Sequence, residues 1–104
     1  MSATRRRLPN RRECTTFAFD CGRHRYIATV SYFPNGELAE IFLGNGRAGS
    51  DVDAAAKDSA VLASIGLQYE IPLSVLRKAL LRDVHGKASS PLGIALDLIA
   101  EDEP

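Results

Sequence analysis

The chain has only two cysteines, no excess of charge of either sign and no long apolar run. A helix that spans a bilayer needs about 20 apolar residues in succession, and no segment approaches that length. The arginines near the start are not followed by a hydrophobic segment, which argues against a secretory signal. Two cysteines are too few to stabilise a secreted fold of 104 residues through disulfides. We therefore expect a cytoplasmic protein without a membrane-spanning segment.

The 13 basic and 13 acidic residues balance, but the two signs are separated along the sequence. Five arginines lie near the start: Arg5, Arg6, Arg7, Arg11 and Arg12. Three acidic residues lie near the end: Glu101, Asp102 and Glu103. A basic arm can contact phosphate groups, although short charged termini are more often simply solvated. The five arginines are therefore the candidate nucleic-acid contacts.

A chain of this length forms one domain with a single core. Hydrophobic residues at 45% and charged residues at 25% are ordinary for a globular protein. We expect residues 1–12 to form a flexible basic arm, residues 13–100 to form the domain, and residues 101–104 to form an acidic tail.

Three segments in the first half of the chain have the patterns of β-strands. Thr15–Phe19 is rich in aromatic and β-branched residues and precedes a turn signal. Arg25–Phe33 carries apolar residues on both faces, which is typical of a central strand. After the turn residues Asn35-Gly36, an extended pattern resumes at Leu38–Leu43. These segments predict a three-stranded meander.

A long helix is expected to begin at about Ser50, whose hydroxyl can accept from the free N–H groups of the first turn. It should end near Tyr69, because Pro72 biases the preceding residue away from helical angles. The stretch Ala60–Leu67 is apolar around nearly the whole helix, which predicts a central helix or an oligomer contact. At its end, Gln68 is expected to hydrogen-bond inside the domain or across an interface.

Two further helices are expected. The leucines Leu73, Leu76 and Leu80 recur at helical spacing, and His85-Gly86 should close that helix. Ser90 is a natural cap for the last helix and Pro91 its favoured first residue. The element order predicts an α+β fold, with a three-stranded antiparallel meander followed by three helices packed on one face.

The turn Gly44-x-Gly46-x-x-Gly49 matches a dinucleotide-binding fingerprint between a strand and a helix. A dinucleotide fold requires a parallel strand after the helix, whereas this sequence predicts two more helices. A Walker-type loop would need a lysine before Ser50. Glycines that serve a tight turn are therefore favoured, while Gly46, Arg47, Gly49 and Ser50 stay candidate contacts for an anion or nucleotide.

Cys14 and Cys21 would point to opposite faces of one continuous strand, so an intramolecular disulfide is not expected. Together with His24 and His85, they match no zinc-ligand spacing. The sequence also contains no nucleophile, base and acid grouping typical of a hydrolase. We therefore expect no metal site, no catalytic residue and no cofactor bound by this chain.

Three sequence motifs fall into one pattern. They are Leu8-Pro9-x-x-Arg12, then Glu40-Ile41-Phe42 before Gly46-Arg47-Ala48-Gly49-Ser50, and Leu67-Gln68-Tyr69 before Ile71-Pro72-Leu73. With them, the chain resembles the TSCPD domain found at the C-terminus of ribonucleotide reductase large chains, especially the adenosylcobalamin-dependent class. The resemblance covers roughly Leu8 to Ile99, and Arg47 stands where the family usually has a lysine.

The resemblance implies an association with the reduction of ribonucleotides for DNA replication or repair, with adenosylcobalamin as the radical source and thiols as reductant. This chain lacks the large barrel and the cysteines for that chemistry, and it ends in Glu101-Asp102-Glu103-Pro104 where the family often has a cysteine-rich tail. What is implied is a free-standing, non-catalytic accessory domain that acts through protein interaction, with a reductase large chain as a possible partner.

A homodimer is also expected, through Ala60–Leu67 or a sheet edge. Two alternatives remain open. One is nucleic-acid binding by the arginine arm together with Arg23 and Arg25, and the other is anion or nucleotide binding at the Gly44 to Ser50 turn.

Overall fold

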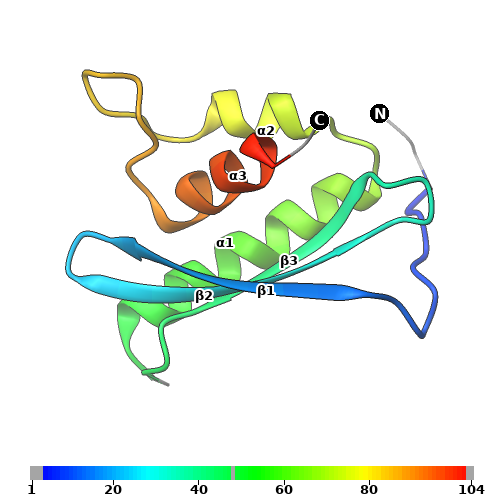
Figure 1. Cartoon of the computed structure of the whole chain (residues 1–104), viewed down its shortest axis with the longest axis horizontal. Coiled ribbons are helices and arrows are strands. Elements are labelled where there is room, and N and C mark those ends of the chain that lie inside the picture. The colour runs from blue at the N-terminus through cyan, green and yellow to red at the C-terminus, as the bar shows by residue number, and fades with distance from the viewer. Residues whose placement is uncertain (1–3, 48, 103–104) are drawn as a thin grey trace.

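The computed structural model describes residues 4–47 and 49–102. The strands are β1 (Cys14–Cys21), β2 (His24–Tyr32) and β3 (Leu38–Gly44), and they pair antiparallel in the order β1-β2-β3 (Figure 1). The helices are α1 (Asp51–Gln68), α2 (Leu73–Ala79) and α3 (Pro91–Glu101). The predicted α+β fold is confirmed. The motif residue Ala48 and the last two residues of the expected acidic tail lie outside the described residues.

One face of the sheet forms the floor of the core. Tyr26 of β2 lies opposite Phe19 of β1, and Val30 of β2 lies opposite Ile41 of β3. All four side chains are buried. Side chains alternate between the faces of a strand, so Ile27 points the other way and is 52% exposed. The predicted central strand is therefore β2, covered on one face.

Helices α1 and α3 cover that face and touch each other, while α2 packs on α3. The residues of α1 that enter the core are mostly small: Ala56, Ala60, Ala63 and Leu67. Their spacing of four and three residues places them on one side of the helix. On the other side, Val61 and Leu62 are 47% and 70% exposed. The helix is thus not enclosed around its whole circumference.

The helix ends follow local sequence signals. The Ser50 hydroxyl accepts from the N–H of Asp53 at 3.1 Å, and the Ser90 hydroxyl accepts from the N–H of Gly93 at 3.2 Å. Pro91 is the first residue of α3, where its missing N–H costs nothing. The predicted caps are confirmed.

The second helix is shorter than predicted. It ends at Ala79, and the expected closure at His85-Gly86 is wrong. The carboxylate of Asp83 accepts from the N–H groups of His85 and Lys87, and Gly86 has φ of +79°. These local bonds stabilise a turn in place of a helix. Residues 80–90 therefore form a hairpin-like loop, which we call the hairpin, with a bridge between Arg82 and Ala88.

Helix α1 also covers the outer edge of β3 (Figure 1). The Ser64 hydroxyl bonds both backbone groups of Ile41, and Gln68 Nε2 donates to the carbonyl of Ala39 at 3.2 Å. Of the two sheet edges considered for a homodimer, the β3 edge is thus occupied by the chain's own helix. The outer edge of β1 remains.

Candidate functional site

The glycine-rich turn before α1 satisfies its own backbone. Gly46 and Gly49 have φ of +78° and +86°, which an L side chain rarely adopts. The N–H of Asn45 donates to the carboxylate of Asp53 at 2.9 Å, and the N–H of Arg47 donates to the Asn45 side-chain oxygen at 2.9 Å. Two amides of the turn, those of Asn45 and Arg47, are therefore already paired within the protein.

A negatively charged side chain, that of Asp53, packs against this turn. The Asp53 side chain is 4% exposed and lies 2.8 Å from the Lys57 ammonium. The hydrogen bond from Lys57 lowers the pKa of Asp53, and the N–H of Asn45 adds to the effect. Anion contacts by Gly46, Arg47, Gly49 and Ser50 stay a prediction, and an anion there would meet the Asp53 carboxylate.

Three of the five candidate arginines bond to the domain. Arg12 Nε lies 2.6 Å from the Glu40 carboxylate, and Arg5 Nε lies 2.6 Å from the side-chain oxygen of Gln68. The Arg6 guanidinium lies 3.7 Å from the centre of the Phe33 ring. The remaining two, Arg7 and Arg11, are exposed.

The Arg12 contact fixes the arm against a buried acid. The Glu40 side chain is 8% exposed and also accepts from the Ser31 hydroxyl at 2.6 Å. The same carboxylate raises the pKa of Arg12. A buried ion pair offsets the cost of desolvation only if hydrogen bonds satisfy both of its members. A role for the five arginines in nucleic-acid binding stays a prediction.

Cys14 and Cys21 stand at the two ends of β1, and both are free thiols, as the strand geometry predicted. Cys14 is exposed, whereas Cys21 is partly buried, and burial raises the pKa of the Cys21 thiol. Within residues 4–47 and 49–102, no three His, Cys, Asp or Glu side chains are placed to hold a metal ion together.

An apolar groove of about 790 Å³ lies between α1 and the hairpin. Its α1 side is formed by Val52, Ala55, Ala56 and Ser59. Its other side is formed by residues 79–82 and by the start of α3 at residues 90–92. Concave, mostly apolar surfaces are the usual shape of binding sites. The sequence prediction missed this groove.

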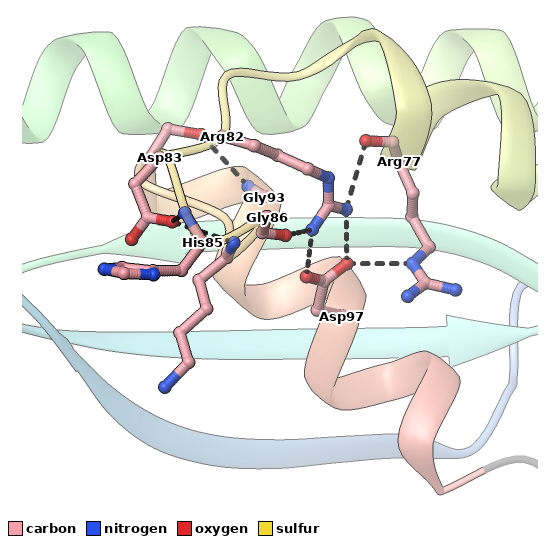
Figure 2. Close-up of polar contacts among 9 residues, drawn as sticks. Arg77, Arg82, Asp83, His85, Gly86, Gly93 and Asp97 are labelled. Atoms are coloured by element: carbon pink, nitrogen blue, oxygen red, sulfur yellow. Dashed lines mark hydrogen bonds and ion pairs between the residues drawn. The ribbon is translucent and has the colours of Figure 1, made fainter.

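The hairpin that forms one wall is anchored to α3 by the ion pair between Arg82 and Asp97, and Arg77 of α2 pairs with the same carboxylate (Figure 2). Arg82 donates to both carboxylate oxygens of Asp97, at 2.8 and 2.9 Å, and Arg77 Nε donates to the same carboxylate at 2.8 Å. Arg82 also donates to the carbonyls of Arg77 and Gly86. Together these bonds fix the hairpin relative to α2 and α3.

The two arginines of this cluster favour the ionised form of Asp97. The hydrogen bond from Arg82 lowers the pKa of Asp97 to about 2, against the opposing effect of partial burial, and Arg77 adds to the lowering. Bidentate arginine–carboxylate pairs are among the stronger hydrogen-bonded contacts. The cluster therefore holds the hairpin at neutral pH.

This anchored hairpin presents apolar side chains to solvent. Leu81, on the groove wall, is 72% exposed, and Val84, in the turn, is 95% exposed. Two signals in the sequence could have revealed the site. Val52, Ala55, Ser59 and Leu62 recur at helical spacing on α1, and Asp83 to Gly86 has the composition of a tight turn.

Among curated proteins, the chain is similar in sequence to vitamin B12-dependent ribonucleotide reductases. The reductase of Agrobacterium fabrum is 34% identical over 73 residues, which are 70% of this chain and 6% of the relative. That of Rhodopirellula baltica is 31% identical over 72 residues, 69% of this chain and 7% of the relative. This chain is similar to a short segment of the vitamin B12-dependent ribonucleotide reductases, as expected for a TSCPD-like domain.

The reductase of Streptantibioticus cattleyicolor extends the comparison, with 33% identity over 69 residues, 66% of this chain. The resemblance predicted from the motifs is confirmed. The TSCPD-like chain matches only 6–12% of the length of these three relatives. No protein-family model matches it, and no solved structure does. Within the described residues, none of its helices is both long and apolar enough to cross a bilayer.

Proposed function

We propose that this TSCPD-like domain is a non-catalytic accessory module that docks onto a vitamin B12-dependent ribonucleotide reductase through the groove between α1 and the hairpin. The observation that carries the proposal is the anchored hairpin, which holds Leu81 at the rim of an apolar groove. Contiguous exposed apolar surface is expensive to keep in water and marks interaction sites. Its contribution to deoxyribonucleotide synthesis is then through protein contact.

The size of the relatives favours the reductase as the occupant of the groove. In each of the three relatives, the matching segment is a small part of a much longer chain. The remainder of such a chain is continuous with the segment and available to cover an apolar groove. A TSCPD-like domain on a separate chain would bind the same kind of reductase surface as an independent partner.

The composition of the groove fits a protein surface better than a charged ligand. On the α1 side it offers Val52 and alanines, and on the hairpin side it offers Leu80 and Leu81. Buried apolar anchors at the centre of an interface contribute most of its binding energy. Arg82, whose guanidinium pairs with Asp97, lies among these lining residues and sets the position of the wall.

The relatives are named as vitamin B12-dependent, but the described residues do not fit that cofactor. A corrin with its nucleotide is far larger than the drug-sized ligands that cavities of this kind hold. Neither His24 nor His85 lines either of the two largest concavities. We therefore assign no contact with cobalamin to this chain.

Light scattering after size-exclusion chromatography tests the proposal. The chain is run alone and with a vitamin B12-dependent reductase from the same cell, at equal concentrations. We expect co-elution with the reductase, and loss of co-elution for Leu81→Lys. The matched control is Ile27→Lys, which changes a similarly exposed apolar residue on the far face of the sheet.

Absence of co-elution, or equal loss for both variants, would contradict docking through the groove. A dimer of the chain alone that Leu81→Lys dissociates would assign the groove to a second copy, against the proposal. Because Leu81 is mostly exposed, its replacement should leave the fold intact, and unchanged thermal unfolding checks this.

A further inference from the structure

A second concavity, of about 700 Å³, lies between the N-terminal arm and the C-terminal end of α1. We call it the arginine pocket. Its polar lining includes Arg5, Arg6, Arg7, Arg12, Glu40 and Gln68. Four arginines and one carboxylate thus line the pocket. The carboxylate is already paired with Arg12, and Arg6 is paired with Glu37, which lies outside the lining. The pocket carries excess positive charge although the whole chain has none.

Much of the hydrogen-bonding capacity of these arginines is unused. A guanidinium has five N–H donors. Arg5 uses Nε on Gln68, and its two terminal nitrogens make no hydrogen bond with any residue in 4–47 or 49–102. Arg12 uses Nε and one terminal nitrogen, on Glu40 and the carbonyl of Pro9. Arg7 makes no hydrogen bond or ion pair with any residue that the structure describes. Converging free guanidinium donors are the chemistry that recognises phosphate oxygens.

The arm that carries these arginines is held in place by its own contacts. The N–H of Arg6 donates to the carbonyl of Gln68 at 2.7 Å, while the Arg6 guanidinium stacks over Phe33 and pairs with Glu37 at 3.3 Å. These contacts fix the backbone at Arg6, between Arg5 and Arg7. A pocket ordered before its ligand arrives loses less entropy on binding.

We propose that the arginine pocket binds a small anion that bears two or more phosphate groups, such as a nucleoside di- or triphosphate. Its volume lies within the range of about 300–1,000 Å³ that such ligands fill. A single-stranded nucleic acid would need a longer basic track with aromatic stacking platforms. Here Arg25 pairs with Asp20, and Arg11 lines a neighbouring concavity that shares Arg12 with the pocket, so binding of a nucleic acid is the alternative that the test separates.

This site is independent of docking through the groove. The groove uses α1 from Val52 to Ser59, whereas the pocket uses Gln68 at the other end. Along a helix the 13 residues from Ala55 to Gln68 span about 20 Å, at about 1.5 Å per residue. Failure of one proposal therefore leaves the other standing.

Isothermal titration calorimetry of the full chain tests the inference with three probes: ATP, inorganic pyrophosphate and a single-stranded DNA oligonucleotide. Each is titrated at low salt into the wild type, Arg7→Gln and Arg11→Gln. Arg7 and Arg11 are both exposed, so both variants should fold as the wild type does. We expect binding of ATP and pyrophosphate, about tenfold weaker for Arg7→Gln because one charge-assisted contact is lost, and unchanged for Arg11→Gln.

Three results would overturn the inference. The first is no heat of binding from ATP or pyrophosphate. The second is an equal loss for the two variants, which would indicate unspecific attraction to the basic arm. The third is binding of DNA alone with a steep dependence on salt and on Arg11, since counterion release marks an extended phosphate track.

Discussion

The hydroxyl of Ser64 accepts a hydrogen bond from the N–H of Ile41 at 2.9 Å and donates one to the carbonyl of the same residue at 3.0 Å. One side chain of α1 thus satisfies both backbone groups of a residue on the outer edge of β3. An unpaired edge is a template for unwanted strand pairing. The helix closes this edge without a fourth strand.

Replacement Ser64→Ala should destabilise the fold by about 1–3 kcal/mol, because it leaves a buried N–H and a buried carbonyl without partners. Urea denaturation measures the loss. Ser59→Ala is the matched control, since its hydroxyl bonds only the carbonyl of Ala56 in its own helix. Equal effects of the two replacements would show that the bonds to the β3 edge add nothing to stability.

Acid should loosen the hairpin through Asp97. Its folded pKa of about 2 lies below the ordinary value of 3.8, so the ion pairs stabilise the fold fully above about pH 4. This stabilisation is lost as the pH falls from about 4 to about 2. Because the carboxylate is partly exposed, we expect a contribution of about 1–2 kcal/mol.

Denaturation midpoints between pH 2 and pH 6 check this prediction. Asp97→Asn should lower stability at pH 6 and flatten the pH dependence below pH 4. Asp58→Asn is the control, because Asp58 is exposed and makes no ion pair within the described part of the chain. An Asp97→Asn protein with the wild-type pH dependence would contradict the assignment.

The turn of the hairpin depends on Asp83. Asp83→Ala removes the acceptor for the N–H groups of His85 and Lys87, both on exposed segments. Amide hydrogen exchange by NMR should show faster exchange at these two residues, with unchanged protection in the strands. Ser89→Ala is the control within the same hairpin. Unchanged exchange at His85 and Lys87 would mean that other bonds hold the turn.

The two thiols should differ in reactivity. Cys14 is exposed, whereas partial burial raises the pKa of Cys21 and lowers its thiolate fraction. With limiting iodoacetamide at pH 7.5, mass spectrometry should find alkylation at Cys14 before Cys21. Faster modification of Cys21 would indicate that the end of β1 opens readily.

Local signals made most of the fold predictable. Ser50, Ser90 and Pro91 act within one helical turn. The apolar and β-branched residues of 25–33 favour a strand, although only one of its faces is covered. The end of α2 was not predictable in this way. The turn at Asp83 and Gly86 is local, but the bond from Arg82 to Asp97, fifteen residues further along the chain, also holds this segment.

The candidate sites were harder to predict for the same reason. The Gly44 to Ser50 turn has a phosphate-binding pattern, but the Asp53 carboxylate accepts from its Asn45 N–H, and this pairing depends on how α1 starts. The helical spacing on α1 and the turn at Asp83 to Gly86 each indicate one wall of the groove, but neither indicates that the two walls face each other. The arginine arm was visible in the sequence, whereas its partners Glu40 and Gln68 were not.

Hydrogen–deuterium exchange of the chain, with and without a vitamin B12-dependent ribonucleotide reductase, tests docking through the groove most directly. The account predicts that the reductase slows exchange in residues 52–59 of α1 and in residues 80–82 of the hairpin. It predicts no change around Ile27 and Phe42 on the far face of the sheet. Protection confined to that far face, or absent everywhere, would contradict the account.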